Sequence, residues 1–325
     1  MNISTSLRRA KAPLALTAAV MLTAAACGGA DAGSGGGEDG GKLSGKVAID
    51  GSSTVAPLSS AASELYAEKQ PGVQVTVATS GTGGGFKKFC VGETDISDAS
   101  RPIKDEEIKT CGENNIKYKQ FAIANDGLSV VVSKENTWAN CLTVAQLKKI
   151  WEPGSKVNNW NQVDPKFPNE PLKLFGAGTD SGTFDYFTDA INGEEGASRT
   201  DYSGSEDDNV TVTGVSGTKG GLGYFGFSYY EENADKLKLV DIDGGGGCVK
   251  PSVSTVQDGS YTPLGRQLFI YPSDAGLKKP QVLDFVEFYV ENNKKIAEDA
   301  KFIPLNDKQE KELQAALEEL KKATK

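Results

Sequence analysis

Apolar and polar positions alternate in some stretches of the chain and recur with helical spacing in others. This pattern predicts strands at residues 46–49, 73–78, 94–97, 128–132, 172–175 and 268–271. It predicts helices at residues 57–69, 86–91, 104–109, 144–151, 183–192, 281–293 and 307–322. The loops are expected to be a tight glycine-rich loop at residues 80–85, a polar, irregular stretch at 192–213, and a glycine-rich turn at 214–225 that leads into a strand.

Strand, turn and helix follow one another repeatedly, which is typical of an α/β fold with a largely parallel sheet. The apolar strand at 128–132 is expected to carry the chain into a second lobe, and the strand at 268–271 to bring it back. We therefore expect a two-lobed molecule with a hinge. Residues 46–130 and 255–325 would form the first lobe and residues 131–254 the second. Such a shape suits a protein that closes around a ligand.

The first 27 residues are not expected to belong to this fold. Basic residues precede an apolar, alanine-rich stretch at 13–26, which is typical of an export signal and too short to span a membrane. Cys27 follows small residues, as in the bacterial lipobox, so we expect it to be acylated and to begin the mature chain. An ordinary cleaved signal is the alternative, and both Sec and twin-arginine export stay open. Residues 28–45 are expected to form a flexible tether.

Composition narrows the function classes. The 325 residues carry a formal net charge of −9, and a chain that is acidic overall is poorly suited to bind nucleic acid. The chain contains no histidine, which excludes Ser-His-Asp and Cys-His catalysis and zinc sites built on imidazole. We expect a monomer that needs no cofactor and no metal.

Four cysteines follow Cys27, and an even number in an exported protein indicates two disulfides. They allow three pairings. We favour a local bond between Cys90 and Cys111, which leaves Cys141 and Cys248 for the second bond. Free buried thiols are the alternative.

Three short runs, at residues 50–55, 95–103 and 178–184, are rich in glycine, serine and threonine and stand where a strand gives way to a helix. Because ligands bind beyond the carboxyl ends of parallel strands, we expect the runs to converge. Backbone N–H groups at helix starts, hydroxyls and the Arg101 guanidinium can replace the water around a tetrahedral oxyanion. The candidate ligands are Ser53, Thr54, Ser80, Thr82, Asp98, Ser100, Arg101, Thr179, Asp180, Ser181, Gly182 and Thr183.

A carboxylate beside an anion becomes useful if the anion still carries a proton that the carboxylate can accept. Fully ionised sulfate would offer only lone pairs and would be rejected. Asp98 and Asp180 are the two candidates for this role, and the sequence does not decide between them.

Other interpretations of these runs are less specific. Serine, threonine and glycine at strand ends are commonly simple turns and helix caps. Residues 81–86 match neither the dinucleotide fingerprint nor a Walker loop. The serine within residues 180–183 could suggest a nucleophile, but no histidine base exists.

Taken together, the runs resemble the phosphate-binding subunit of phosphate ABC transporters, the PstS family. The resemblance depends on residues 51–57, 80–86, 95–103, 179–184, 217–224 and 263–271. It implies a type 2 periplasmic-binding-protein fold with phosphate in the cleft between the lobes.

The site residues that the resemblance implies are Ser53, Thr54, Ser80 or Thr82, Ser181, Gly182 and Thr183. The chain also departs from the family pattern. Ala177 and Thr179 stand where many members have arginine and an acidic residue, and Ser100 stands where many have aspartate. Arg101 would then supply the missing cation from the opposite lobe.

The resemblance further implies an extracytoplasmic, lipid-anchored protein, not an enzyme, that binds inorganic phosphate and delivers it to the membrane permease of an ABC transporter. A binder of sulfate or molybdate is the alternative, and a secreted phosphatase-like enzyme is a weaker one.

Overall fold

The computed structural model describes residues 42–323, which lie within one compact unit. The predicted signal segment, Cys27 and residues 28–41 of the predicted tether lie outside the described residues. Gly45, the last residue assigned to the tether, already belongs to the first strand. Between residues 42 and 323, no helix is both long and apolar enough to cross a bilayer.

The strands are β1 (Gly45–Gly51), β2 (Val73–Ala78), β3 (Ile96–Ala99), β4 (Phe121–Ser133), β5 (Cys141–Thr143), β6 (Lys173–Ala177), β7 (Ser203–Ser205), β8 (Gly221–Gly226), β9 (Leu237–Leu239), β10 (Asp241–Asp243), β11 (Cys248–Val249) and β12 (Gly265–Pro272). The helices are α1 (Ala56–Lys69), α2 (Gly81–Phe89), α3 (Asp105–Glu113), α4 (Val144–Trp151), α5 (Trp160–Val163), α6 (Gly182–Asn192), α7 (Asp208–Ser216), α8 (Phe227–Glu232), α9 (Val253–Gln257), α10 (Asp274–Leu277), α11 (Pro280–Glu291), α12 (Asn293–Asp299) and α13 (Asp307–Ala323).

The large sheet has the order β2-β1-β3-β12-β4-β8-β6-β7, with β9 also paired to β4. Pairing is parallel among β2, β1 and β3 and among β8, β6 and β7, but antiparallel where β12 and β4 join these two groups. The predicted largely parallel sheet is therefore wrong, and the sheet is mixed. The reason is that a strand leaving one half of the molecule and a strand returning to it run side by side in opposite directions.

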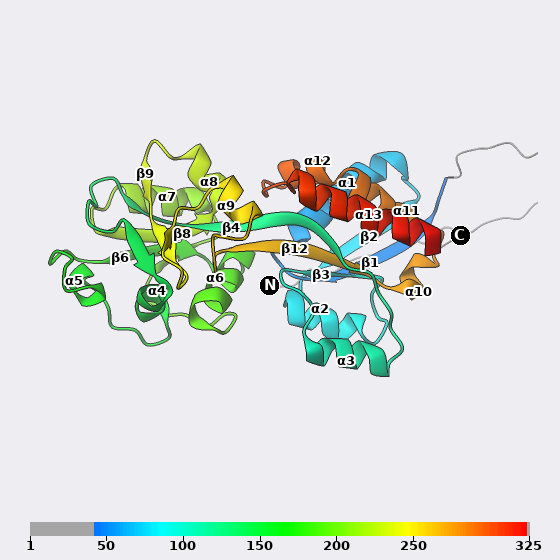
Figure 1. Cartoon of the computed structure of the whole chain (residues 1–325), viewed down its shortest axis with the longest axis horizontal. Helices are drawn as coiled ribbons and strands as arrows, with labels where there is room; N and C mark the ends of the chain where they lie inside the picture. Colours follow the sequence, from blue (N-terminus) through cyan, green and yellow to red (C-terminus); the bar gives the residue numbers. More distant parts are fainter. Residues whose placement is uncertain (1–41, 324–325) are drawn as a thin grey trace, which may run out of the picture. The chain divides into compact units, whose positions relative to one another are not determined.

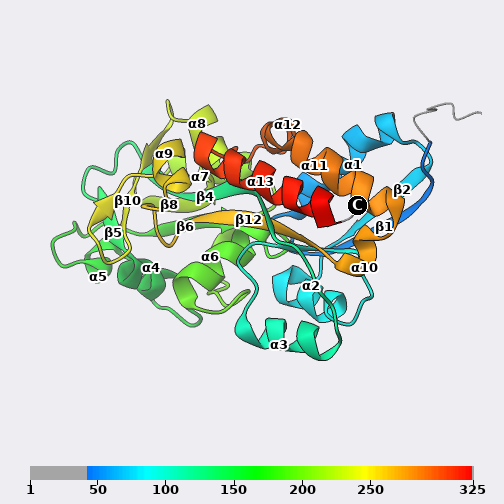
Figure 2. The same cartoon turned by 45° about the vertical axis from the view of Figure 1, so that its right-hand side comes forward.

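Two large hydrophobic cores lie at opposite ends of β4 and β12. Ile123 of β4 belongs to one core and Leu128 to the other, while Leu264, just before β12, and Leu268 divide in the same way. We call the residues around the core that includes Ile123 the first lobe, and those around the core that includes Leu128 the second lobe. Figures 1 and 2 show β4 and β12 running together from one lobe to the other. The boundaries predicted for the lobes, at residues 130/131 and 254/255, stay predictions.

Several predicted elements are displaced or were missed. The run at 80–85 is not a loop, because helix α2 begins at Gly81. The stretch at 192–213 contains β7 and the start of α7, which continues to Ser216 and so takes up the beginning of the predicted turn. The strand expected at 94–97 is β3, two residues later, and the helix expected at 281–293 is divided into α11 and α12.

Close packing explains why α2 contains so much glycine. A Cβ atom on Gly85 would lie 2.5 Å from the Cα of Gly51 and 2.9 Å from the carbonyl oxygen of Asp50. Glycine thus lets the helix lie directly against the end of β1, although it lowers the helix propensity of the segment.

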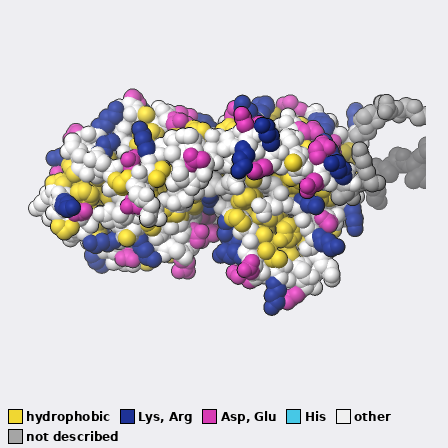
Figure 3. All heavy atoms as spheres, in the orientation of Figure 1, with side chains coloured by type: hydrophobic (Ala, Val, Ile, Leu, Met, Phe, Trp, Pro, Cys, Tyr) yellow, Lys and Arg dark blue, Asp and Glu magenta, His cyan; other side chains and the backbone are white. Residues whose placement is uncertain are grey.

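Two disulfides are present, between Cys90 and Cys111 and between Cys141 and Cys248, with Cα–Cα distances of 4.2 and 6.0 Å. The favoured pairing is the one that the structure contains. The first bond ties the end of α2 to α3, and the second ties β5 to β11. On the face shown in Figure 3, basic and acidic side chains are interspersed over the surface.

Candidate functional site

The loop after β1 places Ser53 and Thr54 between the lobes. The Ser52 N–H donates to the carbonyl oxygen of Asp98 at 2.9 Å, which ties the loop to β3. A Cβ on Gly51 would lie 2.1 Å from that same oxygen, so this position admits only glycine. The two hydroxyl residues therefore stand at a fixed place just before α1.

The start of α6, in the second lobe, contacts this loop directly. Thr54 Oγ1 donates to the Gly182 carbonyl oxygen at 3.1 Å, and Ser53 Oγ donates to Asp185 Oδ2 at 2.9 Å. A Cβ on Gly182 would lie 2.6 Å from the Thr54 nitrogen, which explains glycine here. Ser181 caps the helix, since its hydroxyl accepts from the backbone N–H two residues later.

Two cavities flank this contact, and most of the predicted ligands line one or both of them. The predicted ligands that line the first cavity, of about 280 Å³, are Ser53, Thr54, Thr82, Ser100 and Arg101. Those that line the second cavity, of about 310 Å³, are Ser53, Thr54, Ser181, Gly182 and Thr183. The loop after β1 thus separates the two cavities and contributes hydroxyls to both.

The first lobe supplies two further hydroxyls to the first cavity. Thr82, in the first turn of α2, lies 3.0 Å from Ser100 between the two hydroxyl oxygens, and the Ser100 N–H donates to the Thr82 hydroxyl at 3.2 Å. The two hydroxyls are hydrogen-bonded to each other, so each can rotate and donate its proton to a bound anion instead.

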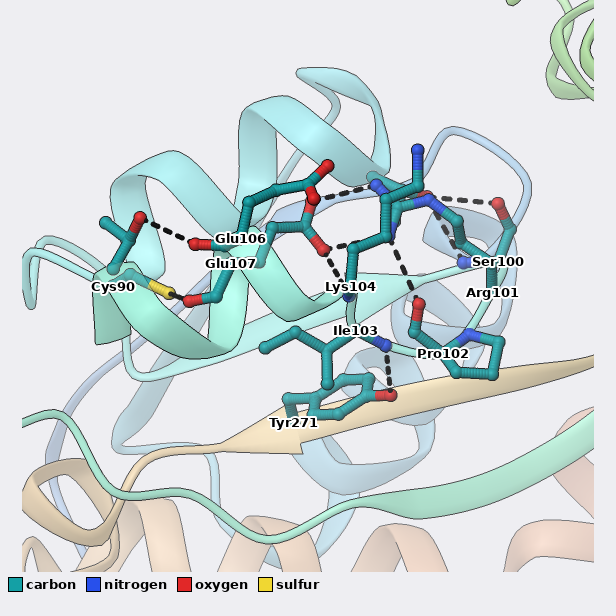
Figure 4. Close-up of polar contacts among 11 residues, drawn as sticks. Cys90, Ser100, Arg101, Pro102, Ile103, Lys104, Glu106, Glu107 and Tyr271 are labelled. Carbon is teal, nitrogen blue, oxygen red and sulfur yellow. Dashed lines mark hydrogen bonds and ion pairs between the residues drawn. The ribbon is translucent and has the colours of Figure 1, made fainter. Parts of the chain in front are cut away.

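Arg101 is held at the edge of the same cavity by Glu107 of α3. Its two terminal nitrogens donate to the two carboxylate oxygens of Glu107, each at 2.8 Å, as Figure 4 shows. The guanidinium also lies 5.8 Å from the centroid of the Phe86 ring. These hydrogen bonds to Glu107 raise the pKa of Arg101 above its ordinary value, so the cation is permanent and fixed in orientation.

A second guanidinium, Arg266 of β12, lines the first cavity and was given no role in the sequence analysis. Its Nη2 donates to Thr54 Oγ1 at 2.9 Å, and its Nε lies 3.4 Å from a carboxylate oxygen of Asp126. Its central carbon lies 3.3 Å from the centroid of the Tyr186 ring. Arg266 stands within residues 263–271, one of the runs on which the family resemblance depends, and this was the available signal.

Four carboxylates from the second lobe also line the first cavity, and none of them was predicted from the sequence: Asp185, Asp189, Glu194 and Glu195. Burial raises the pKa of Asp185, while the Ser53 hydroxyl and the Arg266 charge act in the opposite direction. Burial, followed by the charges of Asp185 and Asp189, raises the pKa of Glu195. The last two carboxylates fall within a stretch where the sequence shows no periodicity.

Comparison with known proteins identifies a family model and several relatives that are similar to this chain. A family model described as a PBP superfamily domain matches residues 36–293. A phosphate-binding protein PstS of Staphylococcus saprophyticus is 42% identical over 304 residues, which are 93% of this chain and 92% of that protein. The protein SphX of Synechococcus elongatus is 49% identical over 262 residues, 80% of this chain and 77% of its own length. This chain belongs to the PstS family of periplasmic-binding proteins.

Solved structures of similar proteins have the same fold as this chain. A possible phosphate binding protein from Planctomyces limnophilus has a TM-score of 0.82 and 48% identity, and the match covers 85% of this chain and 99% of that one. A putative phosphate ABC transporter substrate-binding protein from Clostridium perfringens, solved with bound phosphate, has a TM-score of 0.56 and 25% identity over 81% of this chain and all of its own. The predicted two-lobed type 2 periplasmic-binding-protein fold of the PstS family is confirmed.

Four predicted PstS-type ligands line neither cavity. Asp98 is fully buried, and its carboxylate accepts from Ser59 Oγ at 3.0 Å. Desolvation, together with the charge of Asp50, raises the pKa of Asp98 to about 7. Ser80 is turned to Asp50, to which its hydroxyl donates at 2.8 Å. The last two, Thr179 and Asp180, are exposed on the second lobe.

The residues that line the two cavities thus provide hydroxyls, helix starts and two guanidinium groups, a set that fits the PstS family. Within residues 42–323, no cluster of three or more acidic or cysteine side chains could hold a metal ion. The arrangement can hold a small oxyanion and, through Asp185, can accept a hydrogen bond from it. It offers no acid and base pair around a nucleophile.

Proposed function

We propose that this chain captures inorganic phosphate between its two lobes and passes it to the membrane permease of an ABC transporter. The names of its relatives and the phosphate bound in the Clostridium perfringens protein support this function. The observation that carries the proposal for this chain is the contact of the loop after β1 with the start of α6. That contact joins Thr54 and Ser53 of the first lobe to Gly182 and Asp185, respectively, at the start of α6 in the second.

Bound phosphate would lose its hydration shell and would receive hydrogen bonds from both lobes instead. The hydroxyls of Ser53, Thr82 and Ser100 would come from the first lobe, and the cap and first turn of α6 from the second. Arg101 and Arg266 would supply positive charge. Asp98, Asp180, Thr179 and Ser80 are not part of this proposal, because they line neither cavity.

Closure around the ligand would occur at the places where β4 and β12 pass between the two cores. Residues 124–128 of β4 and 264–268 of β12 join the lobes, so small changes of backbone angle there would move one lobe relative to the other. The lobes in this proposal follow the predicted boundaries, with residues 131–254 as the moving partner of the rest.

The cellular setting is part of the same proposal. Cys27, once acylated, would anchor the chain to the outer face of the cell membrane, and residues after it would keep the binding unit near the permease. We propose a monomer that makes and breaks no covalent bond, as expected of a solute receptor.

Calorimetry tests the function directly. We expect the purified protein to bind phosphate with one site per chain and to bind sulfate and molybdate at least tenfold more weakly, because neither anion brings a proton to the site at neutral pH. Absent phosphate binding, or equal affinity for phosphate and sulfate, would contradict the proposal. Turnover of a chromogenic phosphate ester would indicate an enzyme instead.

A further inference from the structure

The loops at one end of the first lobe carry an excess of lysine. Strands β1, β2, β3 and β4 begin at this end and β12 ends there, as their register shows, and Figures 1 and 2 show α10 beside the start of β1. We call these loops, which are residues 42–46, 69–72, 93–95, 114–120 and 272–280, the base of the first lobe. They contain seven lysines and three carboxylates, whereas the whole chain has a formal net charge of −9.

Hydrogen bonds hold the loops of the base against one another. The Asp274 N–H donates to the Lys117 carbonyl oxygen at 2.8 Å, and Gln281 Nε2 donates to the Lys46 carbonyl oxygen at 3.2 Å. Lys278 stands between Asp274 and Gln281 along the chain. Lysines from three segments that are remote in sequence therefore share one end of the lobe.

Most of the lysines of the base have no counter-charge within residues 42–323. Lys279 pairs with Asp95 at 2.8 Å, and Lys69 pairs with Asp284 at 3.0 Å. Within the same range no ion pair involves the other five, which are Lys42, Lys46, Lys117, Lys119 and Lys278. These five charges can therefore act on an anion outside the molecule.

A cavity of about 550 Å³ opens between two of these lysines. It is lined among others by Lys119, Lys278, Asp274 and Leu277. The cavity has room for a small anionic group beside two ammonium groups, with Asp274 as the carboxylate among these lining residues.

The base is also the part of the lobe at which the described chain begins. Fourteen residues separate Cys27 from Lys42, and a fully extended chain of that length spans at most about 50 Å. An acyl group on Cys27, as proposed above, would therefore keep the base close to the lipid. Attraction to a charged surface extends only about 8 Å at physiological ionic strength, so this confinement strongly favours contact.

We propose that the base of the first lobe binds the anionic phospholipid headgroups of the membrane that carries the anchor. Clusters of about four to eight basic side chains beside a membrane anchor are typical of surfaces that bind anionic lipids, and lysine binds phosphate groups as a point charge. Because the chain as a whole is acidic, such a membrane would repel its other faces. This inference rests on the proposed membrane anchor but not on phosphate binding.

Contact through the base would also orient the molecule. Strand β1 is seven residues long, and Ser53 and Thr54, which line both cavities between the lobes, follow its opposite end. The anion-binding cavities would thus lie away from the lipid, about 20 Å from the base along β1.

The test compares two triple variants of the exported chain from residue 28 onward, purified without lipid, which contains the whole compact unit. One variant combines Lys46→Gln, Lys117→Gln and Lys278→Gln. The matched control combines Lys166→Gln, Lys173→Gln and Lys250→Gln in the second lobe. All six lysines are exposed and make no ion pair within residues 42–323, so both variants lose the same charge. Co-sedimentation measures binding to phosphatidylcholine vesicles with and without phosphatidylglycerol, at low and at physiological salt.

We expect the wild-type chain to bind the phosphatidylglycerol vesicles at least tenfold more tightly than the neutral ones, and less tightly as salt is raised. Because each lysine near an anionic surface contributes roughly fivefold in affinity, the base variant should bind at least tenfold more weakly than wild type. The control should change less than twofold. Calorimetry with phosphate should give unchanged affinity in both variants, which checks the fold.

Equal losses in the two variants, or a wild type without preference for phosphatidylglycerol, would overturn the inference. A wild type that binds these vesicles through the base but does not bind phosphate would contradict the proposed function and still support the inference.

Discussion

At the scale of single residues, Asp98 shows how a buried charge couples folding to pH. Its carboxylate is fully buried, and its Oδ2 has no hydrogen-bond partner within the part of the chain that the structure describes. Desolvation, together with the nearby charge of Asp50, raises the pKa of Asp98 from 3.8 to about 7. The folded protein therefore holds a proton that the unfolded chain releases throughout this interval.

The difference between the folded and the unfolded pKa of Asp98 determines how stability changes with pH. The stabilising contribution is complete below the unfolded pKa of 3.8 and is lost as pH rises toward 7. We expect Asp98→Asn, which cannot ionise, to gain roughly 2–4 kcal/mol in free energy of unfolding relative to wild type between about pH 4 and pH 8. Urea unfolding at both pH values measures this, and an equal difference at both would contradict it.

At the scale of elements, the sequence predicts well where periodicity and capping agree. Residues 144–151 form α4 as predicted, because Thr143 caps a helix with a buried face that includes Leu147. The beginning of α2 was predicted at residue 86 instead of Gly81 because glycine usually indicates a loop, and only the close approach of Gly85 to Gly51 explains its use in a helix. A contact between segments remote in sequence cannot be inferred from local propensity.

Substitutions at two glycines test whether α2 packs directly against β1. Gly85→Ala should destabilise the protein by about 1–3 kcal/mol, because the added Cβ would lie 2.5 Å from the Gly51 Cα. Gly112→Ala in α3 is the matched control, since a Cβ there meets nothing within 4 Å. It should stabilise the protein by roughly 0.5–1 kcal/mol through helix propensity. Urea unfolding measures both, and a stabilising effect at Gly85 would show that α2 does not press on β1.

At the scale of the whole molecule, the site depends on how the lobes are joined. The loops at strand ends were predicted to converge, and eight of the predicted positions do line the two cavities. Arg266, Asp126 and Asp185 were not found, because each derives its role from a partner far away in the sequence. Local sequence patterns identify the polar groups around helix starts. The side chains that connect the lobes can be identified only once the three-dimensional arrangement is known.

Arg266 is the clearest of these connections. It contacts Thr54 of the first lobe, Asp126 of the strand that crosses between the lobes, and Tyr186 of the second lobe. Its side chain is 14% exposed and that of Asp126 is 9% exposed, so removal of the guanidinium would leave a buried carboxylate without its counter-charge. We expect Arg266→Met to lower the free energy of unfolding by about 3 kcal/mol.

A double-mutant cycle separates this charge pair from the other contacts of Arg266. Asp126→Asn in the Arg266→Met background removes the stranded charge, so part of the loss should be regained even though a second side chain has been altered. The coupling energy should amount to about 1–3 kcal/mol. If the two changes were instead additive, Arg266 would stabilise the molecule through Tyr186 and Thr54 alone, and the pair with Asp126 would not help to hold the lobes together.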